Sequence, residues 1–373
     1  MARRARVRIG RGAFRVCVVW GGAWLGVLGC ACGGAKAPPA TPESPAPIPA
    51  EARVHNIELG GPLAVREAEF SGLARMGDTL LLLPQYPGRF PLPEAPGGSI
   101  GALSKREIED WLACHVQELA WQPSDRCPEA ALTPAQWPVD DSAVRPNIDA
   151  FEGYEALVVD GQRAFLTAEI TGPPHDIGYV LRGHFTAESP PKLVLDPPAH
   201  RVVLPRALPN TGLEALLLHD DTLLALYEAC GVRRLHAHYW QPLAPVPMTH
   251  VAYRITDATS PDSRGRFWAI NYRWPGDDHP GPHIDRISER YGRGATHRQT
   301  DAVERLLAFD VRPEGVVLAD QSPISLRLDL ERARKGRNWE GLVRFKEGFL
   351  IASDRHPQSW LAYVHAPHAA RLP

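Results

Sequence analysis

Acidic side chains recur at a fixed spacing along this chain. Five stretches each begin and end with a polar residue fourteen positions apart, with apolar runs and a turn signal between them. The five pairs are Ser71 and Gln85, Glu155 and Glu169, Glu214 and Glu228, Asp257 and Asn271, and Glu340 and Asp354. If these carboxylates meet in one small site they repel each other, so they need a hard cation, paired arginines or raised pKa values.

The donor types indicate which cation would fit. Carboxylates with one asparagine amide suit Ca²⁺ better than Zn²⁺, because zinc prefers histidine and cysteine. An alternative stays open, in which the acids cap backbone N–H groups at strand ends and are solvated separately.

Basic residues flank the last two pairs in the sequence. They are Arg254 and Arg273 around one pair, and Lys335, Arg337, Arg355 and His356 around the other. Beside a cation they could hold an anionic group such as a phosphate, and otherwise they are the counter-charges of the acids. The sequence does not separate these two roles.

Each pair frames a predicted β-hairpin. In the stretch from Glu214 to Glu228, two apolar runs are split by Asp220-Asp221, which is typical of a tight turn. Residues equidistant from the turn are cross-strand neighbours, so the two glutamates are expected side by side at the open end of the hairpin.

The repetition predicts an all-β fold, a β-propeller with five recognisable four-stranded blades. Each complete unit is a hairpin followed by about two further strands, among them 179–185, 192–195, 201–204, 234–240, 250–255, 303–311 and 315–318. The last unit has only 360–365 after its hairpin, so the N-terminal strand 54–59 is expected to close it. The long gaps 71–155 and 257–340 could hide a sixth blade. First strands line the channel of a propeller, so the polar pairs should form a ring at one mouth.

Two long segments interrupt the repeat. In the first, residues 104–116 are predicted to form a short helix with Ser104 as N-cap and Glu107 three residues later, a capping box. A proline-rich loop is expected to follow to about Asn147. The second segment, 274–300, is expected to be a loop, and with 86–147 it could form a recognition surface.

The N-terminus is predicted to be a targeting segment. Six arginines precede an uncharged apolar run, and Val27-Leu28-Gly29-Cys30 resembles the lipobox of bacterial lipoproteins. Residues 1–30 would then be a lipoprotein signal peptide and Cys30 the lipidated residue, with Cys32 or an ordinary cleaved signal as alternatives. Residues 31–53, rich in proline and alanine, would be a tether, and 54–373 a single β-propeller domain. We therefore expect a lipid-anchored protein of the bacterial cell envelope, facing the periplasm or the exterior.

The net charge indicates which partners the protein can bind, and the cysteines indicate its compartment. The chain has 41 basic and 43 acidic residues, and loss of the six N-terminal arginines would leave the mature protein more acidic. An acidic protein is a poor partner for nucleic acid, and a monomer is expected. Cys114 and Cys127 could form a disulfide in an envelope compartment, whereas Cys230 is predicted to be a buried thiol.

Two shorter motifs carry little weight. Gly97-Gly98-Ser99-Ile100-Gly101 matches a nucleophile elbow in letters, but that motif needs a strand–turn–helix in a parallel sheet. His279 and His283 have no cysteine partners and lie among prolines, so a loop is favoured over a zinc site.

Several segments resemble the bacterial family named for esterase-like activity of phytase, the phytase-like propeller lipoproteins. They include Phe151-Glu-Gly-Tyr-Glu-Ala-Leu, Phe267-Trp-Ala-Ile-Asn-Tyr and Asn338-Trp-Glu-Gly-Leu, and the resemblance covers about 54–366. The Glu-Gly-Leu…Asp frame is also similar to the inner strands of gluconolactonase-type propellers, which hold a divalent metal. These resemblances imply a Ca²⁺ site at the channel mouth and phosphoester hydrolysis. The implied ligands are Glu155, Glu214, Asp257, Asn271, Glu340 and Asp354.

Two hypotheses about function follow. In the first, a membrane-tethered, Ca²⁺-dependent hydrolase acts on a small anionic or ester substrate, with Glu169, Glu228, Arg337 and His356 as catalytic candidates. In the second, a non-catalytic envelope protein binds a ligand or partner through the propeller face, and its cation is structural.

Overall fold

All five polar pairs frame β-hairpins in the computed structural model. The structure describes residues 48–366 except 94, 120, 122–126, 128–130, 173–175, 209–210, 277–283 and 356. The hairpins are β2 (Phe70–Met76) with β3 (Thr79–Pro84), β6 (Phe151–Asp160) with β7 (Arg163–Ile170), β10 (Leu213–His219) with β11 (Thr222–Tyr227), β14 (Arg254–Ala258) with β15 (Arg266–Arg273), and β19 (Trp339–Phe345) with β20 (Gly348–Ser353). Their turns need left-handed backbone, which Gly161 supplies at φ 61° and Asp220 at φ 50°.

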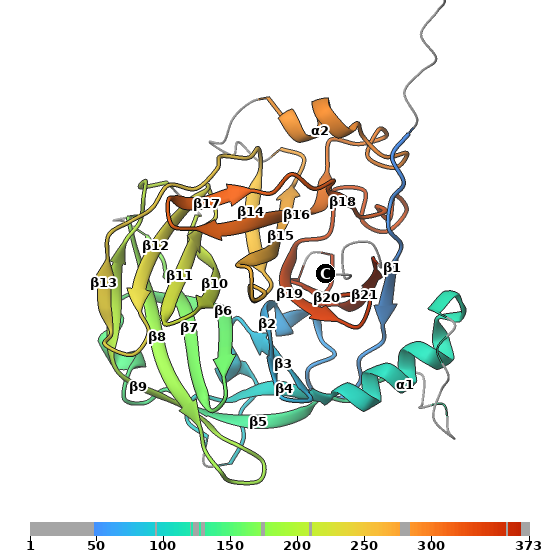
Figure 1. Cartoon of the computed structure of the whole chain (residues 1–373). Helices are drawn as coiled ribbons and strands as arrows, with labels where there is room; N and C mark the ends of the chain where they lie inside the picture. The colour runs from blue at the N-terminus through green and yellow to red at the C-terminus, as the bar shows by residue number, and fades with distance from the viewer. Residues whose placement is uncertain are drawn as a thin grey trace, which may run out of the picture. The chain divides into compact units, whose positions relative to one another are not determined.

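Two outer strands complete every hairpin, which makes a five-bladed β-propeller (Figure 1). The outer strands are β4 (Ser99–Ser104) and β5 (Ala135–Asp140), β8 (Ile177–Phe185) and β9 (Leu193–Val203), β12 (Gly231–His236) and β13 (Gln241–Leu243), β16 (Val303–Arg312) and β17 (Gly315–Leu318), and β21 (Leu361–His365) and β1 (Val54–Ile57). A short strand, β18 (Ile324–Ser325), also pairs with β16. The inner strands β2, β6, β10, β14 and β19 contact one another in a closed ring, as expected of a propeller.

The N-terminal strand closes the ring, as predicted. β1 pairs antiparallel with β21, and the register runs from Val54 opposite Val364 to Ile57 opposite Leu361. The last blade therefore takes strands from both ends of the chain. The two long gaps hold the remaining strands of the first and fourth blades, so the structure has five blades and no sixth among the described residues.

A β-bulge occurs near the start of every inner strand. The register shifts at Ser71, Glu155, Glu214, the pair Thr256–Asp257, and Glu340. Each shift falls on the first residue of a fourteen-residue frame. A bulge re-aims a side chain without ending the strand. Glu214 and Glu228 do lie close together at the open end of their hairpin, since the charge of Glu228 acts on Glu214 more strongly than any other. They are not paired in register, because Leu213 lies opposite Tyr227 and Ala215 opposite Leu226.

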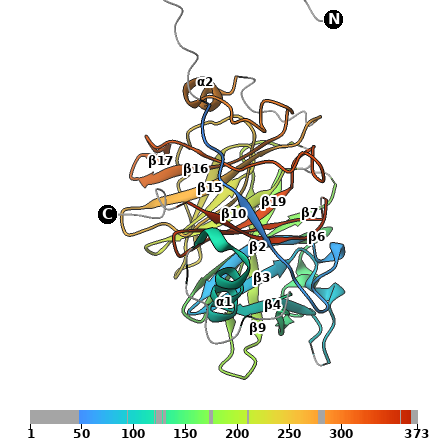
Figure 2. The same ribbon diagram turned by 90° about the vertical axis from the view of Figure 1, so that its right-hand side faces the viewer.

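The first insertion contains the predicted helix and two strands that were not predicted. Helix α1 (Lys105–His115) has the expected capping box of Ser104 and Glu107, and Cys114 and Cys127 form the expected disulfide. The helix begins beside the β2–β3 turn, where Lys105 N–H donates to the Asp78 carbonyl at 2.7 Å. Figure 2 shows α2 at the top of the view and α1 in the lower half. The remainder of the insertion also holds the 3₁₀ turns η2 (Pro87–Arg89), η3 (Gln117–Leu119) and η4 (Arg145–Asn147).

Three strand assignments need correction. The loop expected from 117 to about 147 contains β5, and Ser99 lies in β4 with its hydroxyl donating to the Phe90 carbonyl, so the nucleophile-elbow reading fails. Residues 192–195 and 201–204 belong to one long strand, β9. The residues 250–255 lead into the inner strand β14 instead of completing the third blade. The expected loop 274–300 contains a short helix, α2 (Arg286–Tyr291), capped by Asp285.

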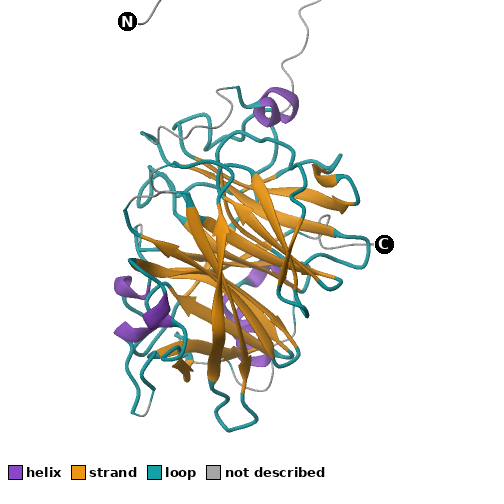
Figure 3. Cartoon of the chain, turned by 90° about the vertical axis from the view of Figure 1, so that its left-hand side faces the viewer, coloured by secondary structure: helices purple, strands orange, loops and turns teal. Residues whose placement is uncertain are grey.

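The core lies between the blades, in one apolar cluster for each neighbouring pair. For example, Leu73 and Leu82 of the first blade pack with Val343 and Leu350 of the last, and corresponding clusters fill the other four junctions. Figure 3 shows that strands form most of the regular secondary structure and that the helices are few and short. Each inner hairpin is buried on both faces. Its sequence is therefore a continuous apolar run and does not alternate between apolar and polar residues. Among the described residues, no helix has the length and apolar character to cross a membrane.

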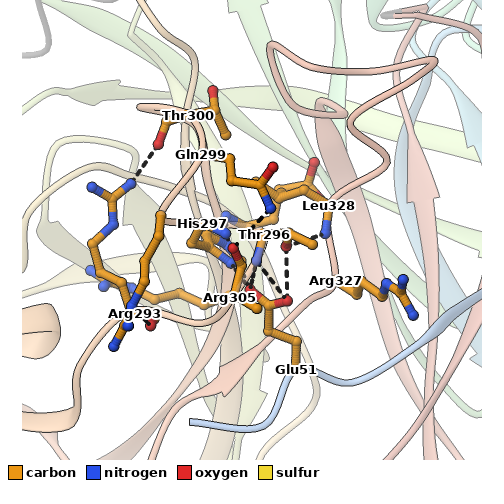
Figure 4. A network of polar contacts seen from close by, with 12 residues as sticks. Glu51, Arg293, Thr296, His297, Gln299, Thr300, Arg305, Arg327 and Leu328 are labelled. Atoms are coloured by element: carbon orange, nitrogen blue, oxygen red, sulfur yellow. Dashed lines mark hydrogen bonds and ion pairs between the residues drawn. The ribbon is translucent and has the colours of Figure 1, made fainter. Parts of the chain in front are cut away.

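Residues 48–53, which the sequence assigns to the tether, contact the fourth blade. The Glu51 carboxylate accepts from the Thr296 and His297 backbone N–H groups and from the Thr296 hydroxyl (Figure 4). His297 Nδ1 lies 2.8 Å from Glu51 Oε1. These bonds lower the pKa of Glu51 although burial opposes them. The predicted signal peptide, Cys30 and the tether up to residue 47 lie outside the described residues.

Candidate functional site

Six carboxyl groups gather at one end of the inner hairpins. This carboxylate cluster comprises Glu155, Glu169, Glu214, Glu228, Glu340 and Asp354. Three of them, Glu155, Glu214 and Glu340, lie on β-bulges of inner strands. The other three lie at the end of the paired strand or just beyond it. The second, third and fifth blades therefore each contribute one pair.

Close backbone approach brings two pairs together. A Cβ atom placed on Gly212 would lie 3.0 Å from Glu169 Oε1 and 3.0 Å from Glu214 Oε1, so both carboxyl groups face the same glycine. Gln85 of the first blade donates from Nε2 to Glu155 Oε1 at 2.7 Å. Gly153 makes room for this amide, because a Cβ there would lie 2.4 Å from Gln85 Cγ. A side chain at position 153 would therefore displace Gln85, and one at position 212 would crowd the two carboxyl groups.

The remaining members have polar partners. Arg254 Nη1 forms an ion pair with Glu228 Oε1 at 2.6 Å. The Asn338 side-chain amide donates to Glu340 Oε1 and, at 3.4 Å, to Asp354 Oδ2. Arg254 is thus a counter-charge, one of the two roles left open by the sequence, while Asn338 was not predicted. The position of Asn338, two residues before Glu340, is the sequence feature that could have indicated this contact.

Burial and mutual repulsion raise the pKa values across the cluster. For Glu155 and Glu214 burial is the main cause, followed by the charge of Glu169 on the first and of Glu228 on the second. Burial, then Asp354, raises the pKa of Glu340 well above its usual value. Burial also raises the pKa of Asp354. The cluster therefore holds more carboxyl groups than its surroundings can keep ionised.

Glu169 has a pKa raised past neutral pH. Burial, followed by the charges of Glu228 and Glu152, raises the pKa of Glu169 to about 8, although Arg254 opposes the shift. At neutral pH this carboxyl group is largely protonated. Its neighbour Glu228 has its own arginine partner, so two acids of one cluster sit in contrasting environments.

The fourth blade supplies no carboxylate to the cluster. Asp257 Oδ2 accepts the Leu342 backbone N–H at 2.6 Å, so this acid caps an inner strand of the next blade. The Asn271 amide donates to the Ala252 and Arg254 carbonyls and accepts from Arg305 Nε at 2.7 Å. The alternative of backbone capping therefore describes Asp257, and Asn271 has a similar structural role.

Two of the basic candidates have other partners. Arg337 is buried and pairs with Glu304, with Nη2 2.7 Å from Oε2. Arg355 Nη1 lies 3.2 Å from Glu69 Oε1, and Arg89 also pairs with Glu69 at 3.0 Å. His356, the fourth catalytic candidate, lies outside the described residues.

The donor chemistry of the cluster fits a hard cation. Carboxylate oxygens are the preferred ligands of Ca²⁺, and a cation would offset both the burial and the mutual repulsion that raise the pKa values of Glu155, Glu214 and Glu340. Within the described ranges, no group of three or more histidine, cysteine, aspartate or glutamate side chains is arranged to hold a metal ion. Side-chain rotation would have to accompany binding.

Comparison with known proteins gives similarity in structure only. No family model matches the chain and no curated protein matches it, so the resemblance to phytase-like propellers stays a prediction. Myxococcus xanthus glutaminyl cyclase is 11% identical, with 85% of this chain and 98% of that one covered and a TM-score of 0.40. Bacillus subtilis arabinanase is 9% identical, with 79% and 93% covered and a TM-score of 0.39. Listeria innocua β-1,2-mannobiose phosphorylase is 9% identical, with 85% and 98% covered and a TM-score of 0.42.

Proposed function

We propose that this propeller is a hydrolase of esters or phosphoesters whose active centre is the carboxylate cluster. The observation that supports this proposal is the contrast between Glu169 and Glu228. Burial and like charge raise the pKa of Glu169 to about 8, while Glu228 is paired with Arg254 at 2.6 Å. Two nearby acids in opposed environments are the usual arrangement for acid–base catalysis.

The two acids would divide the work of hydrolysis. Protonated Glu169 would donate to the oxygen of the leaving group, and Glu228 would accept a proton from the attacking water. Arg254 would hold the Glu228 carboxylate in place through its ion pair. Proton transfer by a positioned side chain contributes about 10²–10⁴-fold in rate.

Ca²⁺ is the cation that the donor set favours. Glu155, Glu214, Glu340 and Asp354 would hold it, since neither Asp257 nor Asn271 has its oxygen atoms free of protein partners. When bound, such a cation polarises the substrate and lowers the pKa of a water ligand. Without it, the buried acids remain partly protonated.

A location in the cell envelope belongs to the same proposal. The lipoprotein-like N-terminus would anchor the domain to a membrane through Cys30. The disulfide between Cys114 and Cys127 supports an oxidising compartment.

A substrate panel tests the proposed function. The full chain, purified with Ca²⁺, would be assayed on alkyl and aryl esters, lactones and phosphomonoesters across pH 5–9. We expect turnover of at least one class, reduced by about 100-fold or more in Glu169→Gln and Glu228→Gln. The control is Glu314→Gln, which changes an exposed acid in the β16–β17 turn. Absence of turnover on the whole panel would overturn the enzymatic reading and favour the non-catalytic binding protein.

A further inference from the structure

The backbone is strained at Tyr253, immediately before the inner strand β14. Tyr253 has φ 74°, a left-handed conformation that is unfavourable for a bulky residue. Such a residue persists only where its surroundings hold it, and residues of this kind concentrate at functional sites. The next residue is Arg254, whose Nη1 lies 2.6 Å from Glu228 Oε1. The direction from which Arg254 reaches the carboxylate cluster therefore depends on this strained residue.

The Asn271 side chain fixes the backbone on both sides of Tyr253. Its Nδ2 donates to the Ala252 carbonyl at 2.8 Å and to the Arg254 carbonyl at 3.1 Å. Asn271 is fully buried, and on β15 it lies opposite Ile255 of β14. An asparagine fits this place because one short side chain offers two N–H donors and a carbonyl acceptor. A buried side chain without those donors would leave two carbonyl groups unsatisfied.

Arg305 orients the Asn271 amide. The two residues lie opposite each other on β16 and β15, and Arg305 Nε donates to Asn271 Oδ1 at 2.7 Å. Because the amide oxygen accepts this bond, the amide nitrogen faces the two carbonyl groups. The guanidinium carbon of Arg305 also lies 5.5 Å from the centre of the Tyr253 ring, within cation–π range. Arg305 thus contacts both the strained residue and the side chain that clamps it.

Asp285 at the start of helix α2 holds Arg305. Nη1 and Nη2 of Arg305 donate to the two Asp285 carboxylate oxygens, each at 2.9 Å, in a bidentate ion pair. Asp285 also accepts the Ile287 and Ser288 backbone N–H groups, so one carboxylate caps the helix and anchors the arginine. Arg305 is only 3% exposed, so loss of Asp285 would leave a buried charge without its counter-charge. A continuous chain of contacts therefore runs from α2 to the carboxylate cluster.

We propose that Asn271 and Arg305 are positioning residues that direct Arg254 toward the carboxylate cluster. Asp285 couples both of them to helix α2, so displacement of α2 releases Arg254 from Glu228. The inference deepens the proposed function, on which it rests for the role of Glu228 as the proton acceptor. The fourth blade supplies no carboxylate to the cluster, and this support of the arginine is what it contributes.

A double-mutant cycle on the full chain tests the coupling without turnover. The equilibrium constant of unfolding in urea is measured for Arg254→Met, Arg305→Met and the double variant. We expect Arg254→Met to change this constant at least about fivefold less in the Arg305→Met background than in the wild type, because the ion pair with Glu228 is already lost there. Additive effects, or Arg254→Met without effect in the wild type, would overturn the proposal.

Arg266→Met is the matched control for Arg305→Met. Arg266 lies on β15, as Asn271 does, and forms its own ion pair with β16, with Nε 2.7 Å from Asp310 Oδ1. Its effect should add to that of Arg254→Met within about twofold, since the two arginines bind different carboxylates. If Arg305→Met does not fold, Asp285→Asn takes its place, because asparagine still caps α2 but no longer carries the counter-charge of Arg305.

Kinetics on a substrate from the panel give a second readout. We expect Arg305→Met and Arg254→Met to lower kcat by similar factors, and the double variant to lose no more than either one, because residues that act as a unit are not additive. An unchanged kcat in Arg305→Met would overturn the positioning role. Absence of turnover in the wild type would contradict the proposed function alone, since the unfolding cycle still decides whether Arg305 and Arg254 are coupled.

Discussion

Replacing Arg337 by alanine is expected to lower the free energy of unfolding by about 3–5 kcal/mol, because it leaves a buried carboxylate without its counter-charge. Glu304 is fully buried and accepts from Arg337 Nε at 3.1 Å and Nη2 at 2.7 Å. The Trp339 indole N–H also donates to Glu304 Oε2, at 2.8 Å. This network joins the fourth blade to the fifth.

Urea unfolding of Arg337→Ala, beside Arg334→Ala as an exposed control, measures this loss. Changing both partners, as Arg337→Ala with Glu304→Gln, should recover part of the stability, because the buried charge is then gone. A stable Arg337→Ala that has lost turnover would contradict this structural role. It would instead restore the catalytic role that the sequence predicted for Arg337.

The carboxylate cluster is expected to make stability fall as pH rises in the absence of divalent cations. Burial raises the folded-state pKa values of Glu155, Glu214 and Glu340, so the folded protein binds protons more tightly than the unfolded chain. Stability is therefore greatest near the unfolded pKa and declines as pH rises toward the folded values. Glu169, whose pKa rises from 4.5 to about 8, should alone contribute up to about 5 kcal/mol of this decline, since one pKa unit corresponds to about 1.4 kcal/mol.

The measurement is urea unfolding in EDTA between pH 5 and pH 8.5. Below this window Glu51 and Asp285, whose pKa values are lowered, would act in the opposite direction. Glu214→Gln should be more stable than the wild type at pH 8.5 and nearly equal at pH 5, because it removes one ionisable member of the cluster. Glu314→Gln should follow the wild type. A flat wild-type profile would show that these acids are not crowded in solution.

The spacing of the polar pairs was enough to predict the blades and the closure of the ring. Each hairpin combines apolar runs with a turn signal, and those local patterns survive in a single sequence. The spare strand before Ser71 and the missing strand after Asp354 together predicted the pairing of β1 with β21. Local signals of this kind fix elements and their order.

The sequence-based predictions were wrong where a strand or a bulge depends on contacts with residues far away in the sequence. β5 contains Pro138 and was interpreted as part of a loop, and Pro197 and Pro198 made β9 look like two short strands, although outer strands tolerate proline. The one-residue bulge at Glu214 is invisible in the spacing.

Side-chain partners were equally hidden. Asp257 has the spacing of the cluster acids, yet its partner is the Leu342 N–H of another blade. Arg337 and Glu304 pair across 33 positions, which no local pattern indicates.

Calorimetric titration of Ca²⁺ into the EDTA-stripped full chain at pH 7.5 tests most directly whether the carboxylate cluster is a functional cation site. The structure leads us to expect binding with proton release, because ionisation of Glu155, Glu214 and Glu340 must accompany it, and loss of binding in Glu214→Gln but not in Glu314→Gln. Absence of binding to the wild type, or equal binding in both variants, would contradict the account. The acids would then be strand-end caps like Asp257.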